Sequence, residues 1–282
     1  MTEEDRQAAA RAAVGRERVA EDRIDRWRAA ALHASLDKDG PPPGDGDPLP
    51  AFHHWIYFLE AAPARALGRD GHPAKGGFIP DLGLPRRMWA GGRLEFRRPL
   101  RIGAAALKRT TIEDVALKTG RTGPLAFVTL RHEISDEAGL CVVERQDVVY
   151  RKDPEPGAPA PTAARAPTNE TASKTLRFDP VTLFRYSALT FNGHRIHYDR
   201  DYAREVEGYS GLVVHGPLIA QLMLDLAEAT LGPAKRFDFQ ARAPAVDGEE
   251  VAVCLKEGDD GAAALWARGA DGRLVMSGAA AV

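Results

Sequence analysis

The chain has 282 residues, 44% of them hydrophobic and 28% charged, as in one large globular domain or two small ones. Its 38 basic residues nearly balance its 40 acidic residues, which argues against a protein that binds nucleic acid through a basic surface. No stretch approaches the roughly 18 apolar residues of a membrane span, and the first residues lack the apolar core of a signal peptide. These values exclude fibrous, disordered and membrane-spanning classes, and we expect neither a nucleic-acid nor a membrane partner.

The two cysteines, Cys141 and Cys254, are too few for a disulfide framework. Each lies in an alternating apolar stretch typical of a strand, so we expect two buried, unpaired thiols. Because free thiols are typical of a reducing compartment, we place the protein in the cytoplasm.

The first half of the chain is predicted to hold a polar leader followed by strands. Residues 1–39 have a polar, helical pattern that ends at a proline-rich stretch. An apolar-aromatic segment follows at 52–59, and then a Gly/Pro-rich run at 63–85 that cannot hold long regular structure. Stretches rich in Val, Thr and Leu between 93 and 151 indicate several antiparallel strands. The turn signals between them are Gly120, Gly123 and residues 136–139.

Residues 153–173 are rich in Pro, Ala and Thr and offer little to bury, so we interpret them as a linker. The linker divides the chain into a first unit at 1–152 and a second at 174–282. The second unit is predicted to begin with two short helices, at 180–189 and 199–207.

A longer helix is predicted at 216–231, where apolar residues recur at helical spacing. Pro217 suits the first turn of this helix, and Gly232 suits its C-terminal end. Residues 235–282 alternate between apolar and polar and break at glycines, which indicates three or four antiparallel strands. The helix is apolar along most of one side, so we expect this sheet to cover it.

One short pattern occurs twice. Arg-x-Pro-x-x-x-Gly spans 97–103 at the start of the first group of strands, and it recurs at 242–248 in the second group. Three matched positions can arise by chance, but strand groups of similar size flank the linker on both sides. We therefore favour a duplicated unit.

The densest group of polar residues lies between the helices predicted at 180–189 and 216–231. It reads Asn192-Gly-His194-Arg-Ile-His197, and then Val-His215-Gly216-Pro just before the longer helix. A single histidine more often satisfies a buried carbonyl than reacts. Three of the eight histidines fall in this one stretch, which favours a reactive site.

This stretch resembles the hydratase motif of MaoC-like, double hot-dog enoyl-thioester hydratases and dehydratases. Their motif is Asp-x-Asn-x-x-His, followed by His-Gly at the start of the central helix. Here Asn192 stands in place of the usual Asp, and His194 in place of the usual Asn. This variant is similar to the branch of the hydroxyacyl-thioester dehydratases type 2 and the mesaconyl-C4-CoA (3-methylfumaryl-CoA) hydratases. The segments 52–59 and 85–96 look like the latter group.

The resemblance implies an α+β double hot-dog fold, in which two antiparallel sheets each wrap on a central helix. The second half then carries the motif, and the first half leaves room for the acyl chain. The implied activity is that of a hydro-lyase, the reversible hydration of an enoyl-CoA to a 3-hydroxyacyl-CoA. The resemblance also implies mesaconyl-C4-CoA or a related branched acyl-CoA as the preferred substrate. No metal or redox cofactor is implied, since coenzyme A is part of the substrate, and a homodimer is compatible with the family.

The chemistry can also be argued from the residues. Hydration needs a base that deprotonates water, a proton for Cα, and a donor for the enolate oxygen. His197 is the best base, because neutral imidazole titrates near working pH. Asn192 cannot accept a proton, but its amide can orient the water or fix the imidazole. His194 is either a second proton-transfer group or a packing residue, and the sequence leaves both open.

Of the remaining candidates, Gly216 is catalytic, and His215 and three arginines are substrate-binding residues. The N–H of Gly216, at the positive end of a helix dipole, suits the thioester oxygen, and a glycine lets the ligand approach the backbone. His215 is expected to shape the loop. Three arginines, Arg86, Arg87 and Arg195, are candidates for contacting an acidic acyl group or the phosphates of coenzyme A.

Other readings are weaker. The pair His53-His54 has no acidic or cysteine partner at a helpful spacing, so we expect no metal. A hot-dog thioesterase would need a carboxylate such as Asp225 or Glu228, yet both lie more than two turns from the start of the helix. A non-catalytic acyl-CoA-binding module is the third alternative, and it would tolerate replacement of His197.

Overall fold

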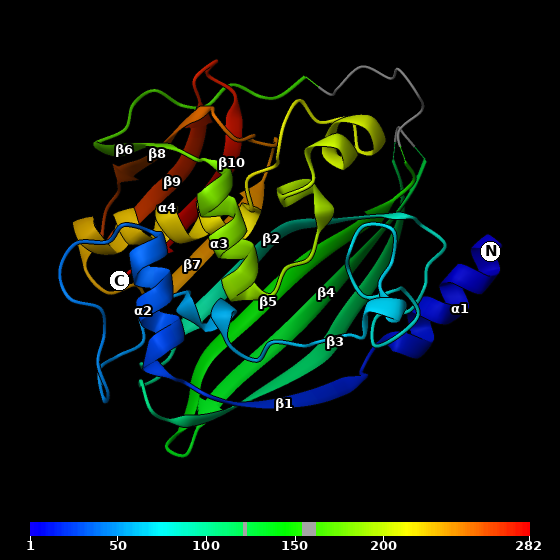
Figure 1. Cartoon of the computed structure of the whole chain (residues 1–282), viewed down its shortest axis with the longest axis horizontal. Coiled ribbons are helices and arrows are strands. Elements are labelled where there is room, and N and C mark those ends of the chain that lie inside the picture. The colour runs from blue at the N-terminus through cyan, green and yellow to red at the C-terminus, as the bar shows by residue number, and fades with distance from the viewer. Residues whose placement is uncertain (121–122, 154–161) are drawn as a thin grey trace.

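A single antiparallel sheet of ten strands organises the computed structural model, which describes residues 1–120, 123–153 and 162–282. The helices lie on one side of this sheet (Figure 1). The strands are β1 (Glu17–Arg23), β2 (Arg86–Phe96), β3 (Ala105–Gly120), β4 (Gly123–Asp136), β5 (Gly139–Arg151), β6 (Ala172–Arg177), β7 (Arg236–Ala241), β8 (Glu250–Glu257), β9 (Ala262–Gly269) and β10 (Leu274–Ala281). The helices are α1 (Glu3–Ala13), α2 (Arg26–Ser35), α3 (Pro180–Thr190) and α4 (Gly216–Leu231), with the short helical turns η1 (His53–Ile56), η2 (Ala64–Ala66), η3 (Arg195–His197) and η4 (Tyr202–Val206).

The strand order shows that the chain is built from two equivalent halves. The sheet runs β1-β3-β4-β5-β2 in the first half and β7-β10-β9-β8-β6 in the second. The second order is the reverse of the first when β6 to β10 are matched to β1 to β5. The two halves meet where β2 pairs with β7 in antiparallel register, for example Gly92 with Phe239. This pairing joins the two predicted sheets into one. Without it, β2 and β7 would each be an unpaired edge strand.

The glycine of the repeated Arg-x-Pro-x-x-x-Gly pattern has the same structural role in both halves. Gly103 and Gly248 lie just before β3 and β8, with positive φ angles of 93° and 80°. The N–H of Gly103 donates to the carbonyl oxygen of Ile24 at 2.6 Å, and that of Gly248 donates to Phe178 at 2.8 Å. Both acceptors directly follow the first strand of their half. These matching contacts confirm the duplication.

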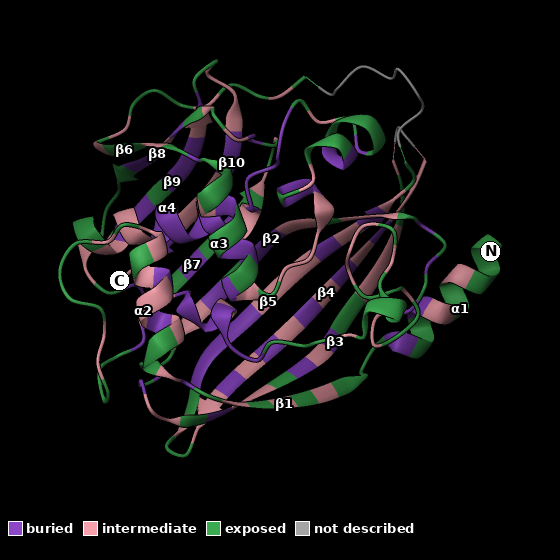
Figure 2. Ribbon diagram, in the orientation of Figure 1, coloured by how far each residue is buried: buried purple, intermediate pink, exposed green. Residues whose placement is uncertain are grey.

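The second half forms around α4, as the helical spacing predicts. Most of α4 is buried, and the helix packs against strands β6 to β10 (Figure 2). Pro217 lies in its first turn, and Gly232 ends it with a φ of 100°. Between α2 and β2 the first half has only the short turns η1 and η2 and no counterpart of α4, because the segment 63–85 is rich in Gly and Pro. The two halves therefore differ in what covers their sheets.

The N-terminal residues correct one prediction. Residues 1–39 are not a helical leader throughout, because β1 pairs with β3 along residues 17–23 and extends the sheet. Alternate residues of β1 are exposed and mostly charged, a pattern suited to an edge strand but easily mistaken for a polar helix. The helix α1 packs on the sheet through Ala10 and Ala13.

Other predicted elements are found with small changes. The helix at 180–189 is α3, while the predicted helix at 199–207 contains the π-helical turn η4. The predicted linker 153–173 includes residues 154–161, which lie outside the described residues, and its last two residues belong to β6. Cys141 and Cys254 are free and buried, in β5 and β8. No helix in the described ranges is both long and apolar enough to cross a membrane.

Candidate active site

The polar stretch between α3 and α4 folds into a tight turn. The helix α3 ends at Phe191, whose φ of 49° is left-handed. The backbone N–H of Asn192 then donates to the carbonyl oxygen of Ser187 at 2.8 Å, and its side-chain Oδ1 accepts the backbone N–H of His194 at 3.0 Å. This turn directs the chain into η3, which carries His197.

The position of His197 suits it to act as a base. Its Nδ1 lies 2.7 Å from the carbonyl oxygen of Val213, which can only accept a hydrogen bond. Nδ1 therefore carries the proton, and Nε2 of the neutral ring keeps its lone pair. Among the described residues Nε2 has no hydrogen-bond partner, and the residue is 7% exposed. Burial lowers the pKa of His197 to about 4, so the ring is neutral at neutral pH.

Asn192 does not fix this imidazole, since the contact that orients the ring comes from Val213. The Asn192 carbonyl oxygen is used within the turn, on the N–H of His194. Among the described residues the Asn192 amide nitrogen has no protein acceptor, which leaves it available to a water molecule.

The ring of His215 packs against the ring of His197. The two rings stack with their centroids 3.7 Å apart and their planes at 18°. His215 is fully buried, and its Nε2 lies 2.8 Å from the hydroxyl oxygen of Ser187 on α3. Burial, together with the charges of His197 and His194, lowers the pKa of His215 well below the ordinary value. The contact with Ser187 joins α3 to the start of α4.

A fourth histidine, His72, joins the group and has no counterpart in the sequence motif. Its ring centroid lies 4.7 Å from that of His194, which in turn lies 5.6 Å from that of His197. His194 therefore faces the other imidazoles instead of pointing away from them. Burial is the main reason that the pKa values of His72 and His194 both fall to about 3. All four rings are neutral at neutral pH.

His72 reaches the motif through a loop of the first half. The backbone N–H of Arg195 donates to the carbonyl oxygen of Asp70 at 2.9 Å. A Cβ on Gly71 would lie only 2.0 Å from the carbonyl oxygen of Gly193, so the two chain segments pack backbone to backbone. Glycines at both positions allow this approach. The first half thus supplies part of the site.

Gly216 begins α4, and no side chain caps that end of the helix. A Cβ on Gly216 would lie 2.7 Å from Cε3 of Trp89, so the indole of β2 occupies the space beside this glycine. Close packing of Trp89 is therefore a reason for the glycine that the sequence does not show. The free N–H groups at this helix end remain suited to a developing negative charge.

The structure separates the three candidate arginines. Arg86 forms an ion pair with Glu207 at 3.0 Å, in which the two side chains are 10% and 7% exposed. Arg195 forms an i,i+4 ion pair with Asp199 at 2.7 Å and lies over the ring of Tyr202. Both therefore have near partners. Arg87 is held more loosely, with Nη2 3.7 Å from a carboxylate oxygen of Asp70 and a buried Nε that has no partner in the described structure.

The other candidates lie apart from the histidines or have structural partners. His54 donates to the buried carboxylate of Glu144 at 2.9 Å. In the described ranges, no group of three or more His, Cys, Asp or Glu side chains is arranged to hold a metal ion. Asp225 forms an ion pair with Lys38 at 2.7 Å, and Glu228 accepts the N–H of Ala234. These contacts engage the two carboxylates that a thioesterase would require.

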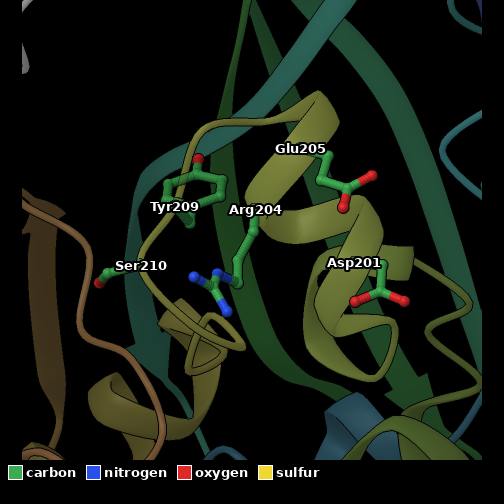
Figure 3. A pocket seen from close by; sticks show the side chains of 5 residues that line it. All are labelled: Asp201, Arg204, Glu205, Tyr209 and Ser210. Carbon is green, nitrogen blue, oxygen red and sulfur yellow. The ribbon is translucent and has the colours of Figure 1, made fainter.

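A surface pocket of about 550 Å³ lies beside η4 (Figure 3). Arg204 extends from η4 toward the loop that carries Tyr209 and Ser210, and none of the lining residues was predicted as a site residue. Tyr209 accepts a hydrogen bond from Arg86 at 2.9 Å. The pocket is lined by Asp201, Arg204, Glu205, Tyr209 and Ser210.

Comparisons with known proteins agree with the motif and the topology. The family model of hydroxyacyl-thioester dehydratase type 2 matches residues 52–247. The chain is 45% identical to mesaconyl-C4-CoA hydratase of Chloroflexus aurantiacus over 268 residues, which cover 94% of each protein.

Two solved structures show the same fold at low sequence identity. A MaoC-like dehydratase has a TM-score of 0.71 at 15% identity, covering 96% of this chain and 98% of that one. A Mycobacterium tuberculosis protein with a double hot-dog fold has a TM-score of 0.54 at 16% identity, covering 95% and 96%. The chain therefore belongs to the hydroxyacyl-thioester dehydratase type 2 family and is a hydro-lyase with a MaoC-like double hot-dog fold.

Proposed function

We propose that the protein catalyses the reversible hydration of mesaconyl-C4-CoA, or of a closely related branched acyl-CoA. The 45% identity to a mesaconyl-C4-CoA hydratase over nearly the whole chain supports this substrate class. The observation that carries the chemistry is the hydrogen bond from His197 Nδ1 to Val213, because it leaves the Nε2 lone pair free to accept a proton.

In this proposal His197 is the catalytic base. Its Nε2 takes a proton from water while the water oxygen bonds to Cβ of the enoyl group. The electron pair of the double bond then moves toward the thioester, and negative charge develops on the carbonyl oxygen. The imidazolium returns its proton to Cα, so one water is added in total. A positioned base of this kind contributes about 10² to 10⁴ in rate.

The start of α4 is the proposed site for the developing negative charge. The N–H of Gly216 donates to the thioester oxygen, with the positive end of the helix dipole behind it. A donor placed in this way contributes about 3 to 4 kcal/mol of transition-state stabilisation in other enzymes. No metal ion or redox cofactor is needed for any of these steps.

The residues around His197 orient the water, transfer a proton or hold the imidazole ring in place. We assign to the Asn192 amide the orientation of the attacking water, because its oxygen is already used within the turn. The ring of His194 faces His197, so His194 is the candidate for a second proton-transfer group. His215 and Ser187 hold the plane of the His197 ring and are positioning residues.

We also propose that the protein works in the cytoplasm, which suits the two free, buried thiols Cys141 and Cys254. A homodimer remains a proposal drawn from the family resemblance. Light scattering of the purified protein at micromolar concentration distinguishes a monomer of 30.5 kDa from a dimer of twice that mass.

The test of the function is a screen of enoyl-CoA thioesters, followed by loss of conjugated absorbance. We expect turnover of mesaconyl-C4-CoA and lower efficiency on crotonyl-CoA. A thiol reagent in a parallel assay detects coenzyme A, whose release would instead indicate a thioesterase. Binding of acyl-CoA without either signal would indicate the non-catalytic module. The outcome that contradicts the proposal is a protein that hydrates no enoyl-CoA.

A further inference from the structure

We propose that Arg87 and His72, both from the first half of the chain, form the subsite that binds the free carboxylate of the acyl group. This inference rests on the proposed function and names the residues that would make the enzyme specific for a dicarboxylic acyl chain. Neither residue belongs to the hydratase motif, which lies in the second half.

The position of the subsite follows from the substrate. In 3-methylfumaryl-CoA the free carboxylate is bonded to Cβ, the atom that the water attacks. Its binding partner must therefore lie close to the group of histidines that contains His197. His194 lies next to His197, and His72 lies next to His194, with ring centroids 5.6 Å and 4.7 Å apart. Arg87 Nη2 lies 3.7 Å from one carboxylate oxygen of Asp70, and the other oxygen accepts the backbone N–H of His72 at 3.1 Å, so the guanidinium and His72 lie on either side of the same carboxylate.

Arg87 has unused binding capacity, unlike the other arginines near the motif. Its side chain is 21% exposed, its Nε is buried without a partner in the described residues, and its contact with Asp70 is long, at 3.7 Å. A largely buried cation with free donors is costly unless an anion completes it. A guanidinium binds a carboxylate through two parallel hydrogen bonds. Arg86 and Arg195 already have close carboxylate partners.

His72 supplies a neutral donor on the same side. Its loop is tied to the motif by the hydrogen bond from Arg195 to Asp70, so its ring position is fixed relative to His194. A neutral imidazole donates one N–H to a carboxylate without adding a second charge to the site. The methyl group of crotonyl-CoA, by contrast, has no use for either donor.

The test compares the efficiency, kcat/KM, for mesaconyl-C4-CoA with that for crotonyl-CoA in each variant. We expect Arg87→Leu to lower the ratio at least 100-fold, mainly through KM, and Arg87→Lys to keep part of it, since lysine provides charge without the planar fork. His72→Phe should lower the ratio about 10-fold, the effect of losing one hydrogen bond. Crotonyl-CoA turnover reports that each variant is folded.

Arg93→Leu is the matched control, because Arg93 lies on the same strand but is 56% exposed and pairs with Asp147. Its substrate ratio should stay at the wild-type value. A wild type that prefers mesaconyl-C4-CoA, combined with equal losses on both substrates in Arg87→Leu and Arg87→Lys, would overturn the subsite but leave the proposed function intact. A wild type that handles crotonyl-CoA equally well would overturn the subsite and the preferred substrate but leave the hydratase chemistry standing.

Discussion

The imidazole rings of His197 and His215 stack face to face, 3.7 Å apart at their centroids. Two protonated rings at this separation would repel each other strongly in a buried setting. Burial lowers the pKa of both, which keeps the stack neutral at neutral pH. The arrangement that leaves His197 free to act as a base therefore also makes the fold sensitive to acid.

We predict that the free energy of unfolding falls steeply as the pH drops from 6.5 toward 5. Six histidines have folded-state pKa values below the ordinary 6.5, mainly through burial, so the unfolded chain binds more protons in this range. They are His53, His72, His132, His194, His197 and His215. At one pH unit below 6.5, protonation of each of these histidines in the unfolded chain lowers the free energy of unfolding by about 1 kcal/mol. The whole free energy of unfolding of an ordinary domain is only about 5–15 kcal/mol.

Denaturant unfolding at pH values from 5 to 8 measures this dependence. Stability should be nearly constant above pH 7, where both states are unprotonated at these groups. His72→Gln removes one of the six groups and should reduce the slope below pH 6.5. An unfolding free energy that is the same at pH 5.5 and pH 8 would contradict the buried, neutral state of the cluster.

Replacement of His197 tests the proposed base. We expect His197→Ala to lower hydratase activity roughly 100-fold or more while the fold is retained, since a positioned base contributes about 10² to 10⁴ in rate. Single-turnover kinetics and circular dichroism are the measurements. Near-normal turnover by a folded His197→Ala protein would remove this residue from the mechanism.

The second half could be predicted well because its signals are local. The apolar spacing of 216–231, with Pro217 and Gly232 at its ends, is enough to predict α4 and its buried face. The motif residues 192–197 are close in sequence, so one turn brings them together. Local patterns of this kind need no knowledge of the rest of the fold.

The contribution of the first half could not be predicted in this way. His72 lies in a Gly/Pro-rich run without periodicity, and it meets His194 only because two glycine backbones pack together across the halves. The sequence also cannot show which arginine has a near carboxylate, since Arg86 pairs with Glu207, more than a hundred residues away. The polar residues of β1 form a strand because their backbone pairs with the edge of β3, a long-range contact that the local pattern does not show.

Asn192→Asp tests whether this side chain lies beside the base. The carboxylate has nearly the shape of the amide and can still accept the N–H of His194, so the turn should persist. A negative charge near His197 should raise the pKa of its ring and move the acidic limb of the pH–rate profile upward. Asn192→Ala, which adds no charge, is the control. An unchanged acidic limb in Asn192→Asp would mean that the two side chains are not neighbours.

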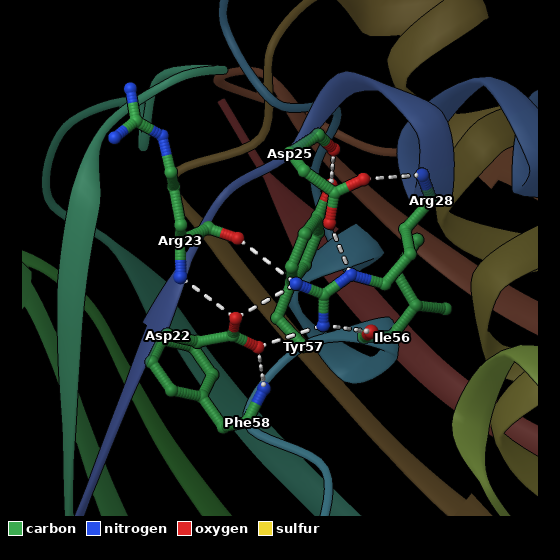
Figure 4. Close-up of polar contacts among 7 residues, drawn as sticks. All are labelled: Asp22, Arg23, Asp25, Arg28, Ile56, Tyr57 and Phe58. Atoms are coloured by element: carbon green, nitrogen blue, oxygen red, sulfur yellow. Dashed lines mark hydrogen bonds and ion pairs between the residues drawn. The ribbon is translucent and has the colours of Figure 1, made fainter.

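Arg28 is expected to contribute to the stability of the first half of the sheet (Figure 4). Its guanidinium donates two hydrogen bonds to the Asp22 carboxylate, at 2.7 and 2.8 Å, and also pairs with Asp25. Asp22 in turn accepts the N–H of Phe58 at 2.7 Å, which ties the segment after η1 to β1. We expect Arg28→Leu to lower the free energy of unfolding by roughly 1.5–3 kcal/mol, the scale for hydrogen bonds to charged groups.

Denaturant unfolding of Arg28→Leu beside Arg23→Leu is the comparison. Arg23 lies on β1 next to Asp22, but its side chain has no ion pair in the described structure, and its loss should change stability by less than about 0.5 kcal/mol. Equal stability of the two variants would show that the network does not hold the N-terminal strand in place.

Gly216→Ala separates two reasons for a glycine at the start of α4. A Cβ there would lie 2.7 Å from Cε3 and 2.9 Å from Cζ3 of Trp89, so the indole or the helix end must shift. We expect a loss of about 1–3 kcal/mol in stability, typical of overpacking, together with reduced activity because the Gly216 N–H moves with the helix end.

The double variant Gly216→Ala with Trp89→Leu then decides between packing and ligand approach. If only Trp89 requires the glycine, the two changes should couple favourably, and the double variant should be more stable than the sum of the single changes implies. If the acyl-thioester also approaches Gly216 closely, activity should stay low in the double variant although stability recovers, because the new methyl group still stands beside the N–H donor. Thermal unfolding gives the first quantity and kcat/KM the second. A single Gly216→Ala variant with wild-type stability and activity would contradict both reasons.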